Sequence, residues 1–138
     1  MRFLIPVNAG LLAVFLSVGA EGASALPPLQ TNARVMGELV AGEVAYQIQK
    51  NCESITMRKL RAYSKLRKLA GYAESLGYSD DDFDALSKDN GARATRDSRV
   101  NAFLAEHGVS KGNPDSYCRL GVEEIEKKSL TGWLLRAN

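Results

Sequence analysis

Two cysteines and a single histidine are the residues of this 138-residue chain best suited to redox chemistry or metal binding. Cys52 and Cys118 have 65 residues between them, whereas redox-active cysteines usually lie close together, as in the C-x-x-C pattern. A structural zinc site requires about four ligands, and the two cysteines with His107 fall short of that number. The spacing therefore favours a structural disulfide over a redox pair or a metal site. We expect no metal and no other cofactor.

A run of basic residues between positions 58 and 68 is the second candidate site, because it contains no acidic residue. At helical spacing, four cations form one continuous stripe that an aromatic residue extends: Arg58, Arg61, Lys65, Lys68 and Tyr72. An acidic envelope protein, a lipid headgroup layer or an anionic polymer would fit this surface. The alternative is a solvated helix face, partly neutralised by the acidic cluster at positions 80–84.

The acidic cluster and His107 carry weaker indications of chemistry. An EF-hand loop that began at Asp80 would need glycine at its sixth position and glutamate at its twelfth, which are Ala85 and Gly91 here. The acidity instead suits the first turn of a helix capped by Ser79. His107 falls on an apolar helix side near a helix end, which indicates a structural role. A small enzyme with a site near His107 stays open as an alternative, since a fold can bring distant residues together.

The composition limits the classes of partner. The formal net charge is +2, with 18 Lys and Arg against 16 Asp and Glu. This near balance and the lack of a matching motif predict no nucleic acid as partner. No serine lies in the G-x-S-x-G pattern of a nucleophile elbow, so no motif supports hydrolase chemistry.

The N-terminus has the features of a signal peptide. A basic second residue is followed by a mostly apolar run over 3–20 and by small residues at 23–25, which suit a signal peptidase. We therefore predict a signal peptide over 1–25, an extended leader over 26–30 and one helical domain over 31–138. Export would make the protein periplasmic or secreted and would expose its cysteines to an oxidising environment. Alternatively, the segment stays uncleaved as a membrane anchor, although its uninterrupted apolar core is short for a spanning helix.

Hydrophobic periodicity predicts an all-α fold, a small single-domain bundle of about five helices with one disulfide. The expected helices span about 31–51, 55–76, 79–88, 92–106 and 113–128. N-caps are expected at Thr31 or Asn32, Ser54, Ser79 and Asn113, and Pro114 suits a first helical position. Gly77 suits the end of the second helix. No window shows convincing alternation of polar and apolar residues, so strands are not expected.

The C-terminal segment holds the sole tryptophan, in the run Trp133-Leu134-Leu135. Folded back, this run would cap the core of a small domain, which is the interpretation that we favour. Exposed, it would form an apolar patch for a partner or a membrane surface. Trp133 therefore joins the basic stripe as a suspected contact residue.

Several short motifs resemble those of a family of short exported alphaproteobacterial proteins known only as a domain of unknown function. They are Cys52-x-Ser54-Ile55, Gly77-Tyr78-Ser79 and Pro114-x-Ser116-Tyr117-Cys118-x-Leu120-Gly121. The resemblance covers nearly all of the chain after the signal peptide and ends with Gly132 and Leu135-Arg136. It implies an exported helical protein with paired cysteines. It implies no activity, ligand or catalytic residue.

Together these observations predict a non-catalytic periplasmic binding or accessory protein. The basic stripe is the suspected contact surface, and the Trp133 segment is a second one. Two alternatives stay open: a membrane-associated accessory subunit held by an uncleaved N-terminal segment, and a small envelope enzyme with a site near His107. No residue pattern names the ligand or sets the oligomeric state.

Overall fold

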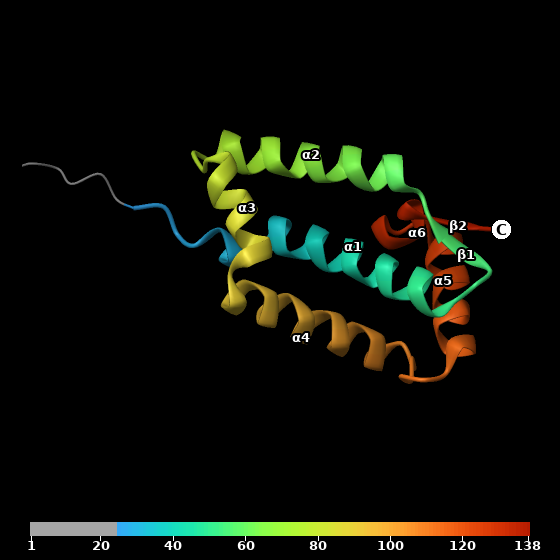
Figure 1. The fold of residues 1–138 in the computed structure, drawn as a ribbon. Helices are drawn as coiled ribbons and strands as arrows, with labels where there is room; N and C mark the ends of the chain where they lie inside the picture. Colours follow the sequence, from blue (N-terminus) through green and yellow to red (C-terminus); the bar gives the residue numbers. More distant parts are fainter. Residues whose placement is uncertain (1–24) are drawn as a thin grey trace, which may run out of the picture.

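The computed structural model describes residues 25–138, so the predicted signal peptide, apart from Ala25, lies outside the described residues. Within this range the chain forms six α-helices, one 3-10 helix and a two-stranded sheet (Figure 1). In chain order the elements are η1 (Leu29–Thr31), α1 (Ala33–Asn51), β1 (Ile55–Met57), α2 (Lys59–Ser75), α3 (Asp80–Lys88), α4 (Asn90–Glu106), α5 (Pro114–Lys127), α6 (Leu130–Leu134) and β2 (Leu135–Ala137). The helical fold is confirmed, with a small sheet added.

Helix α1 is the central element. Figure 1 shows it between α2 and α4, with α3 at one end of the bundle and α5 at the other. The larger core lies at the α5 end and gathers residues of several elements, among them Ile48 of α1 and Leu120 of α5, both fully buried. A smaller core lies at the α3 end and includes Val35 of α1 and Leu69 of α2. Buried apolar side chains at both ends of α1 therefore hold the bundle together.

Side-chain caps begin the helices largely where the sequence predicts. The side chain of Asn32 accepts a hydrogen bond from the backbone N–H of Val35 at 3.0 Å, which starts α1. Ser79 and Asp82 form a reciprocal capping box at the start of α3. Pro114 occupies the first turn of α5, where its missing N–H leaves no bond unmade. These contacts satisfy backbone donors that a helix start cannot satisfy itself.

The predicted start of the fourth helix at Ala92 is two residues late. The carboxylate of Asp89 accepts a hydrogen bond from the backbone N–H of Ala92 at 2.6 Å, so α4 begins at Asn90. The backbone N–H of Asp89 in turn donates to the carbonyl of Ala85 at the end of α3. Asp89 thus joins two helices without a separate loop.

The predicted helix over 55–76 is wrong in its first turn. Ile55 to Met57 form β1, which pairs antiparallel with β2, so that Met57 lies opposite Leu135. The backbone N–H of Arg58 donates to the carbonyl of Leu134 at 2.7 Å, and α2 begins only at Lys59. The C-terminal segment also bonds before β1, where the backbone N–H of Asn138 donates to the Ser54 carbonyl at 2.9 Å. Local periodicity cannot reveal such a pairing. Strands are therefore present, against expectation.

The C-terminal segment divides between the two predicted interpretations. Leu134 and Leu135 are 3% and 2% exposed and cap the larger core, as favoured. Trp133 is 41% exposed, so the tryptophan itself does not join that core. Successive side chains of the short α6 lie about 100° apart around the helix axis, so Trp133 points away from the core that Leu134 enters.

The predicted leader over 26–30 is only partly extended. Leu29 is buried in the smaller core and begins the short η1. The Tyr78 hydroxyl donates to the carbonyl of Pro27 at 2.6 Å, which fastens the entering chain to the turn before α3. The extended part therefore ends at Pro28. None of the helices in the described range is long and apolar enough to cross a membrane.

Candidate functional site

The two cysteines form a disulfide. Cys52 and Cys118 are bonded, with their Cα atoms 5.2 Å apart, and Cys52 is fully buried in the larger core. The bond joins the end of α1 to the first half of α5 and confirms the predicted structural link. Among residues 25–138, no group of three or more His, Cys, Asp or Glu side chains lies together in a way that could hold a metal ion. The cysteines thus serve the fold.

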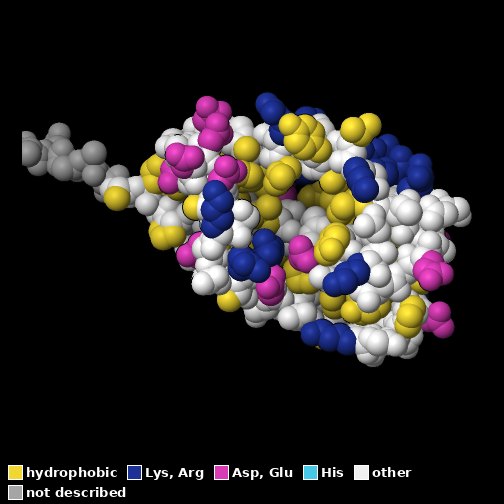
Figure 2. All heavy atoms as spheres, viewed as in Figure 1, with side chains coloured by type: hydrophobic (Ala, Val, Ile, Leu, Met, Phe, Trp, Pro, Cys, Tyr) yellow, Lys and Arg dark blue, Asp and Glu magenta, His cyan; other side chains and the backbone are white. Residues whose placement is uncertain are grey.

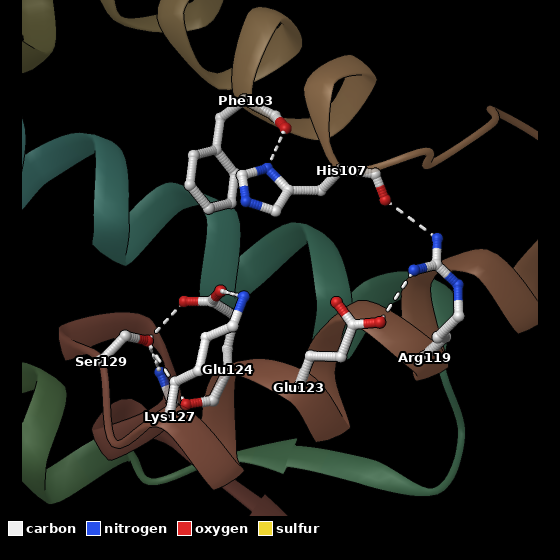
Figure 3. Close-up of polar contacts among 8 residues, drawn as sticks. Phe103, His107, Arg119, Glu123, Glu124, Lys127 and Ser129 are labelled. Carbon is white, nitrogen blue, oxygen red and sulfur yellow. Dashed lines mark hydrogen bonds and ion pairs between the residues drawn. The ribbon is translucent and has the colours of Figure 1, made fainter.

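His107 lies at the end of α4, where its ring stacks on Phe103 with the centroids 4.0 Å apart. Its Nδ1 lies 2.7 Å from the Phe103 carbonyl oxygen, which also accepts the backbone N–H of His107 at 3.1 Å. Arg119 donates to the His107 carbonyl at 2.9 Å and pairs with Glu123 at 2.9 Å (Figure 3). No described carboxylate or hydroxyl group hydrogen-bonds to the imidazole. These contacts are those of a helix end that is tied to α5.

A second polar cluster in Figure 3 joins α5 to α6. The buried Glu124 carboxylate accepts a short hydrogen bond from the Ser129 hydroxyl and lies 3.7 Å from the Nζ of Lys127. Ser129 also caps α6, because its Oγ accepts a hydrogen bond from the backbone N–H of Gly132 at 3.0 Å. The cluster holds two helices in contact, and a structural role accounts for each of its polar groups.

The first two cations of the predicted stripe bind the C-terminal segment. The Nε of Arg58 donates to the Leu135 carbonyl at 3.1 Å. The Nη1 of Arg61 donates to the Trp133 carbonyl at 3.1 Å, and its guanidinium lies 4.9 Å from the centroid of the Trp133 ring. These donors satisfy carbonyl groups that the end of α6 leaves free. The contacts fasten the C-terminal segment to the start of α2.

Two of the three remaining stripe residues contact α1. Lys65 forms an ion pair with Glu38 of α1 at 3.1 Å, and the guanidinium of Arg34 stacks over the Tyr72 ring at 4.1 Å. Lys68 is exposed and forms no ion pair with any residue of the described range. The structure thus gives most of the stripe an intramolecular role and leaves Lys68 available to a partner.

The outward side of α2 carries a different set of residues. Leu60 is 87% exposed and Tyr63 is 61% exposed, and neither contributes to a core. Lysine and arginine side chains gather around the start of the helix, next to the sheet, with hydrophobic side chains projecting beside them (Figure 2). We call this surface the α2–Trp133 face, and it consists of Lys59, Leu60, Arg61, Tyr63, Arg67, Lys68, Trp133 and Arg136.

The electrostatics of this face are of one sign. The chain has no Asp or Glu between residues 54 and 73 or after residue 126. The Tyr63 hydroxyl accepts a hydrogen bond from the Nη1 of Arg67 at 3.4 Å, and this contact raises the pKa of Arg67. The N-terminus of α2 adds the positive end of a helix dipole beside Lys59. The face therefore attracts negative charge and has no acidic side chain of its own to neutralise it.

Sequence reasoning missed Leu60 and Tyr63. Both lie off the helix side that Leu66, Leu69 and Ala73 share, three residues apart, and this spacing on the polar side was an available signal. Leu66 falls at helical spacing on the side of Leu69 and Ala73, yet it is 45% exposed. Within α2 only Leu69 and Ala73 are buried, so the apolar side that packs is much shorter than the pattern suggests.

A polar cleft between α1 and α4 is a weaker candidate. Its lining includes Glu43 and Asp97 as well as Arg96 and Lys111, so both signs of charge are present. Glu43 also accepts a hydrogen bond from Gln47 at 2.9 Å. Mixed charge of this kind selects no single class of ligand, whereas the α2–Trp133 face does.

Comparison with known proteins places the chain in a group without an assigned activity. A family of unknown function (DUF5333) matches residues 27–136, which is nearly the whole described range. The chain belongs to this family. No curated protein matches it significantly, and no solved structure does.

Proposed function

We propose that this DUF5333 protein is a non-catalytic binding or accessory protein that acts outside the cytoplasm and contacts its partner through the α2–Trp133 face. One observation carries the proposal: no side chain between Lys59 and Lys68 is buried. Most of the stability of a protein helix comes from packing of an apolar face, and this half-helix has almost none. Its apolar residues instead project from the molecule, where they favour contact with another surface.

The charge of the face supports an anionic or acidic partner. Six of the residues between 58 and 68 are Lys or Arg, and the segment contains no carboxylate. A one-sign surface of this kind raises the rate and affinity of association with the opposite charge, most strongly at low salt. The partner is thus expected to present negative charge over an area rather than at one point.

A binding role also agrees with how the reactive side chains are used. Cys52 and Cys118 are held in a disulfide, and the Nδ1 of His107 lies against a backbone carbonyl. These contacts give the enzyme alternative near His107 no nucleophile or carboxylate partner within the described residues. The proposal therefore assigns the protein no reaction.

The disulfide supports a site of action outside the cytoplasm, since such bonds persist in oxidising compartments. Together with the predicted signal peptide over 1–25, this favours a periplasmic or secreted protein. The alternative of an uncleaved membrane-held form differs in one measurable property. The intact mass of the exported protein would begin at Leu26 in the first case and at Met1 in the second.

Charge reversal tests the proposed contact surface. The double variant Lys59→Glu and Arg67→Glu changes two exposed cations of the α2–Trp133 face. We expect this variant to capture fewer envelope components after chemical cross-linking than the unaltered protein does. The matched control is Arg93→Glu with Arg99→Glu, two exposed arginines of α4 that form no ion pair within residues 25–138.

Both double variants change the net charge by the same amount, so a general effect of charge would alter capture by both. Loss only in the α2 variant supports the proposal. Equal capture by all three proteins, with unchanged far-ultraviolet circular dichroism, would reject the α2–Trp133 face as the contact surface.

A further inference from the structure

We propose that the partner of the α2–Trp133 face is the surface of an anionic phospholipid layer, into which Leu60 inserts while the surrounding cations bind the phosphate groups. This inference rests on the proposed function and names the chemistry of its partner. Leu60 is the most exposed large hydrophobic residue of the described range, at 87%. An exposed leucine surrounded by cations has the composition of an interfacial anchor.

The cations lie where headgroups would lie if Leu60 entered the layer. An open hollow beside Leu60 is lined by Arg58, Lys59, Arg61 and Arg136, together with Met57. No acidic side chain contributes to this lining. Several cations around one hollow suit a phosphate group, because guanidinium groups donate to its oxygens in pairs. The apolar anchor and the phosphate site are therefore adjacent.

Two exposed aromatic residues that lie beside cations of this face match the same interface. Tyr63 is 61% exposed and Trp133 is 41% exposed, and each has a cation close to its ring, Arg67 and Arg61 respectively. Tyrosine and tryptophan are enriched at the headgroup level of membranes, because one part of the ring system is apolar and the other is polar. Leucine, tyrosine and tryptophan on one face thus provide insertion and positioning together.

The distribution of charge favours lipid over an acidic protein. Protein–protein interfaces are depleted of charged residues at their centre and place them at the rim. On this face Arg67 lies about two helical turns from Leu60 and next to Tyr63, so charged and apolar groups alternate across the centre. α2 also lies at the edge of the bundle, as Figure 1 shows, so that its outward side meets a flat surface without obstruction. A headgroup layer accepts such a mixture, since cations remain among phosphates and water.

Vesicle binding provides the test, and the protein carries its own probe because Trp133 is the sole tryptophan. The full chain is mixed with vesicles of phosphatidylcholine alone or of phosphatidylcholine and phosphatidylglycerol in equal parts. We expect sedimentation with the anionic vesicles only, with Trp133 emission shifted to shorter wavelength. Binding should weaken as salt is raised. The intact mass of each protein is measured first, so that only proteins with the same N-terminal residue are compared.

Paired variants locate the contact. Leu60→Ser should reduce the partition coefficient of the protein between water and the anionic vesicles about tenfold. The reason is that insertion of the leucine side chain supplies most of the favourable free energy of apolar burial. Val122→Ser, which alters an exposed valine of α5, should leave it within about twofold. Lys59→Glu with Arg67→Glu should reduce it by tenfold or more, and Arg93→Glu with Arg99→Glu should not.

Three results would overturn the lipid assignment: no preference for anionic vesicles, an unchanged Trp133 emission on binding, or an equal loss in the control variants. The two proposals fail separately. If vesicles are not bound but the α2 variant alone still loses its cross-linked envelope partner, the partner is an acidic protein and the proposed function stands. If neither vesicle binding nor capture depends on α2, both proposals are rejected.

Discussion

Helices α5 and α2 have similar lengths and opposite uses. Of the 14 residues of α5, five are buried: Ser116, Tyr117, Leu120, Gly121 and Glu124. Of the 17 residues of α2, two are buried, Leu69 and Ala73. α5 is also bonded covalently to the end of α1, whereas α2 is held in its first half by Arg58, Arg61 and Lys65 through polar contacts.

The difference shows that the residues of α5 serve mainly to stabilise the fold, whereas those in the first half of α2 do not. In α5 nearly every inward position fills space in the larger core. In the first half of α2 the apolar residues are exposed and the cations are numerous, so the segment contributes little to the core and much to the surface. Three measurements test this contrast, and a fourth tests a contact that lies outside both helices.

The disulfide should show the largest effect. Replacing Cys52 and Cys118 by serine opens a loop with a sequence separation of 66 residues. We expect a loss of roughly 4 kcal/mol in the free energy of unfolding, on the chain-entropy estimate. Chemical denaturation of the oxidised protein and the double variant measures it. A loss below about 1 kcal/mol would show that the bond adds little to an already stable α5 end.

A pair of leucines compares the two helices directly. Leu120 of α5 is 0% exposed and Leu60 of α2 is 87% exposed. We expect Leu120→Ala to cost about 3 kcal/mol, through lost burial and a residual cavity, and Leu60→Ala to change stability by less than about 0.5 kcal/mol. Urea unfolding of both variants gives the difference. Similar losses would mean that α2 packs more tightly than the exposed fractions indicate.

A pair of glycines should give effects of opposite sign. A Cβ added at Gly132 of α6 would overlap the backbone carbonyl of Glu124 in α5, whereas one added at Gly71 of α2 meets nothing within 4 Å. Gly132→Ala should therefore destabilise the protein by about 2 kcal/mol, and Gly71→Ala should stabilise it by about 0.5–1 kcal/mol. The shifts in melting temperature should differ in sign. A destabilising Gly71→Ala would contradict the open surroundings of α2.

The smallest expected effect is the dependence of stability on pH at the start of α3, which lies outside α2 and α5. Hydrogen bonds from the backbone N–H and the hydroxyl of Ser79 lower the pKa of Asp82 below its ordinary value near 3.8. The charged carboxylate therefore adds stability above that ordinary value, and the contribution is lost as the pH falls through the folded pKa. Unfolding of the unaltered protein and Asp82→Asn at several pH values measures it. The exposed Asp81→Asn variant is the control, and a difference that persists at the lowest pH would contradict the assignment.

Local signals in the sequence predicted much of the helical framework. The capping residues Asn32 and Ser79 and the first-turn Pro114 stand beside the groups that they serve, so their effect needs no distant partner. The pairing of Cys52 with Cys118 could also be predicted, because the chain offers no other cysteine.

Contacts between the β1 segment and the C-terminal segment could not be predicted from such local signals. Ile55 to Met57 are compatible with a helix by pattern, and only the backbone of residues 135–137 turns them into a strand. The same segment offers carbonyl acceptors to Arg58 and Arg61 and so ties these two cations to the C-terminal segment. Helical spacing within a single segment gives no information about acceptors that a distant segment provides.

The sequence by itself determined the caps, the helical class and the disulfide, because each depends on residue types at short spacing or on a unique pair of cysteines. Only the tertiary structure decided which side of α2 remains free. Of the cations in the predicted stripe, Arg58 and Arg61 contact the C-terminal segment and Lys65 contacts α1. Lys68 stays exposed, and Leu60 and Tyr63 project beside the stripe. The physical reason is that exposure is a property of the whole fold: a side chain is available to a partner only where no other element of the chain covers it.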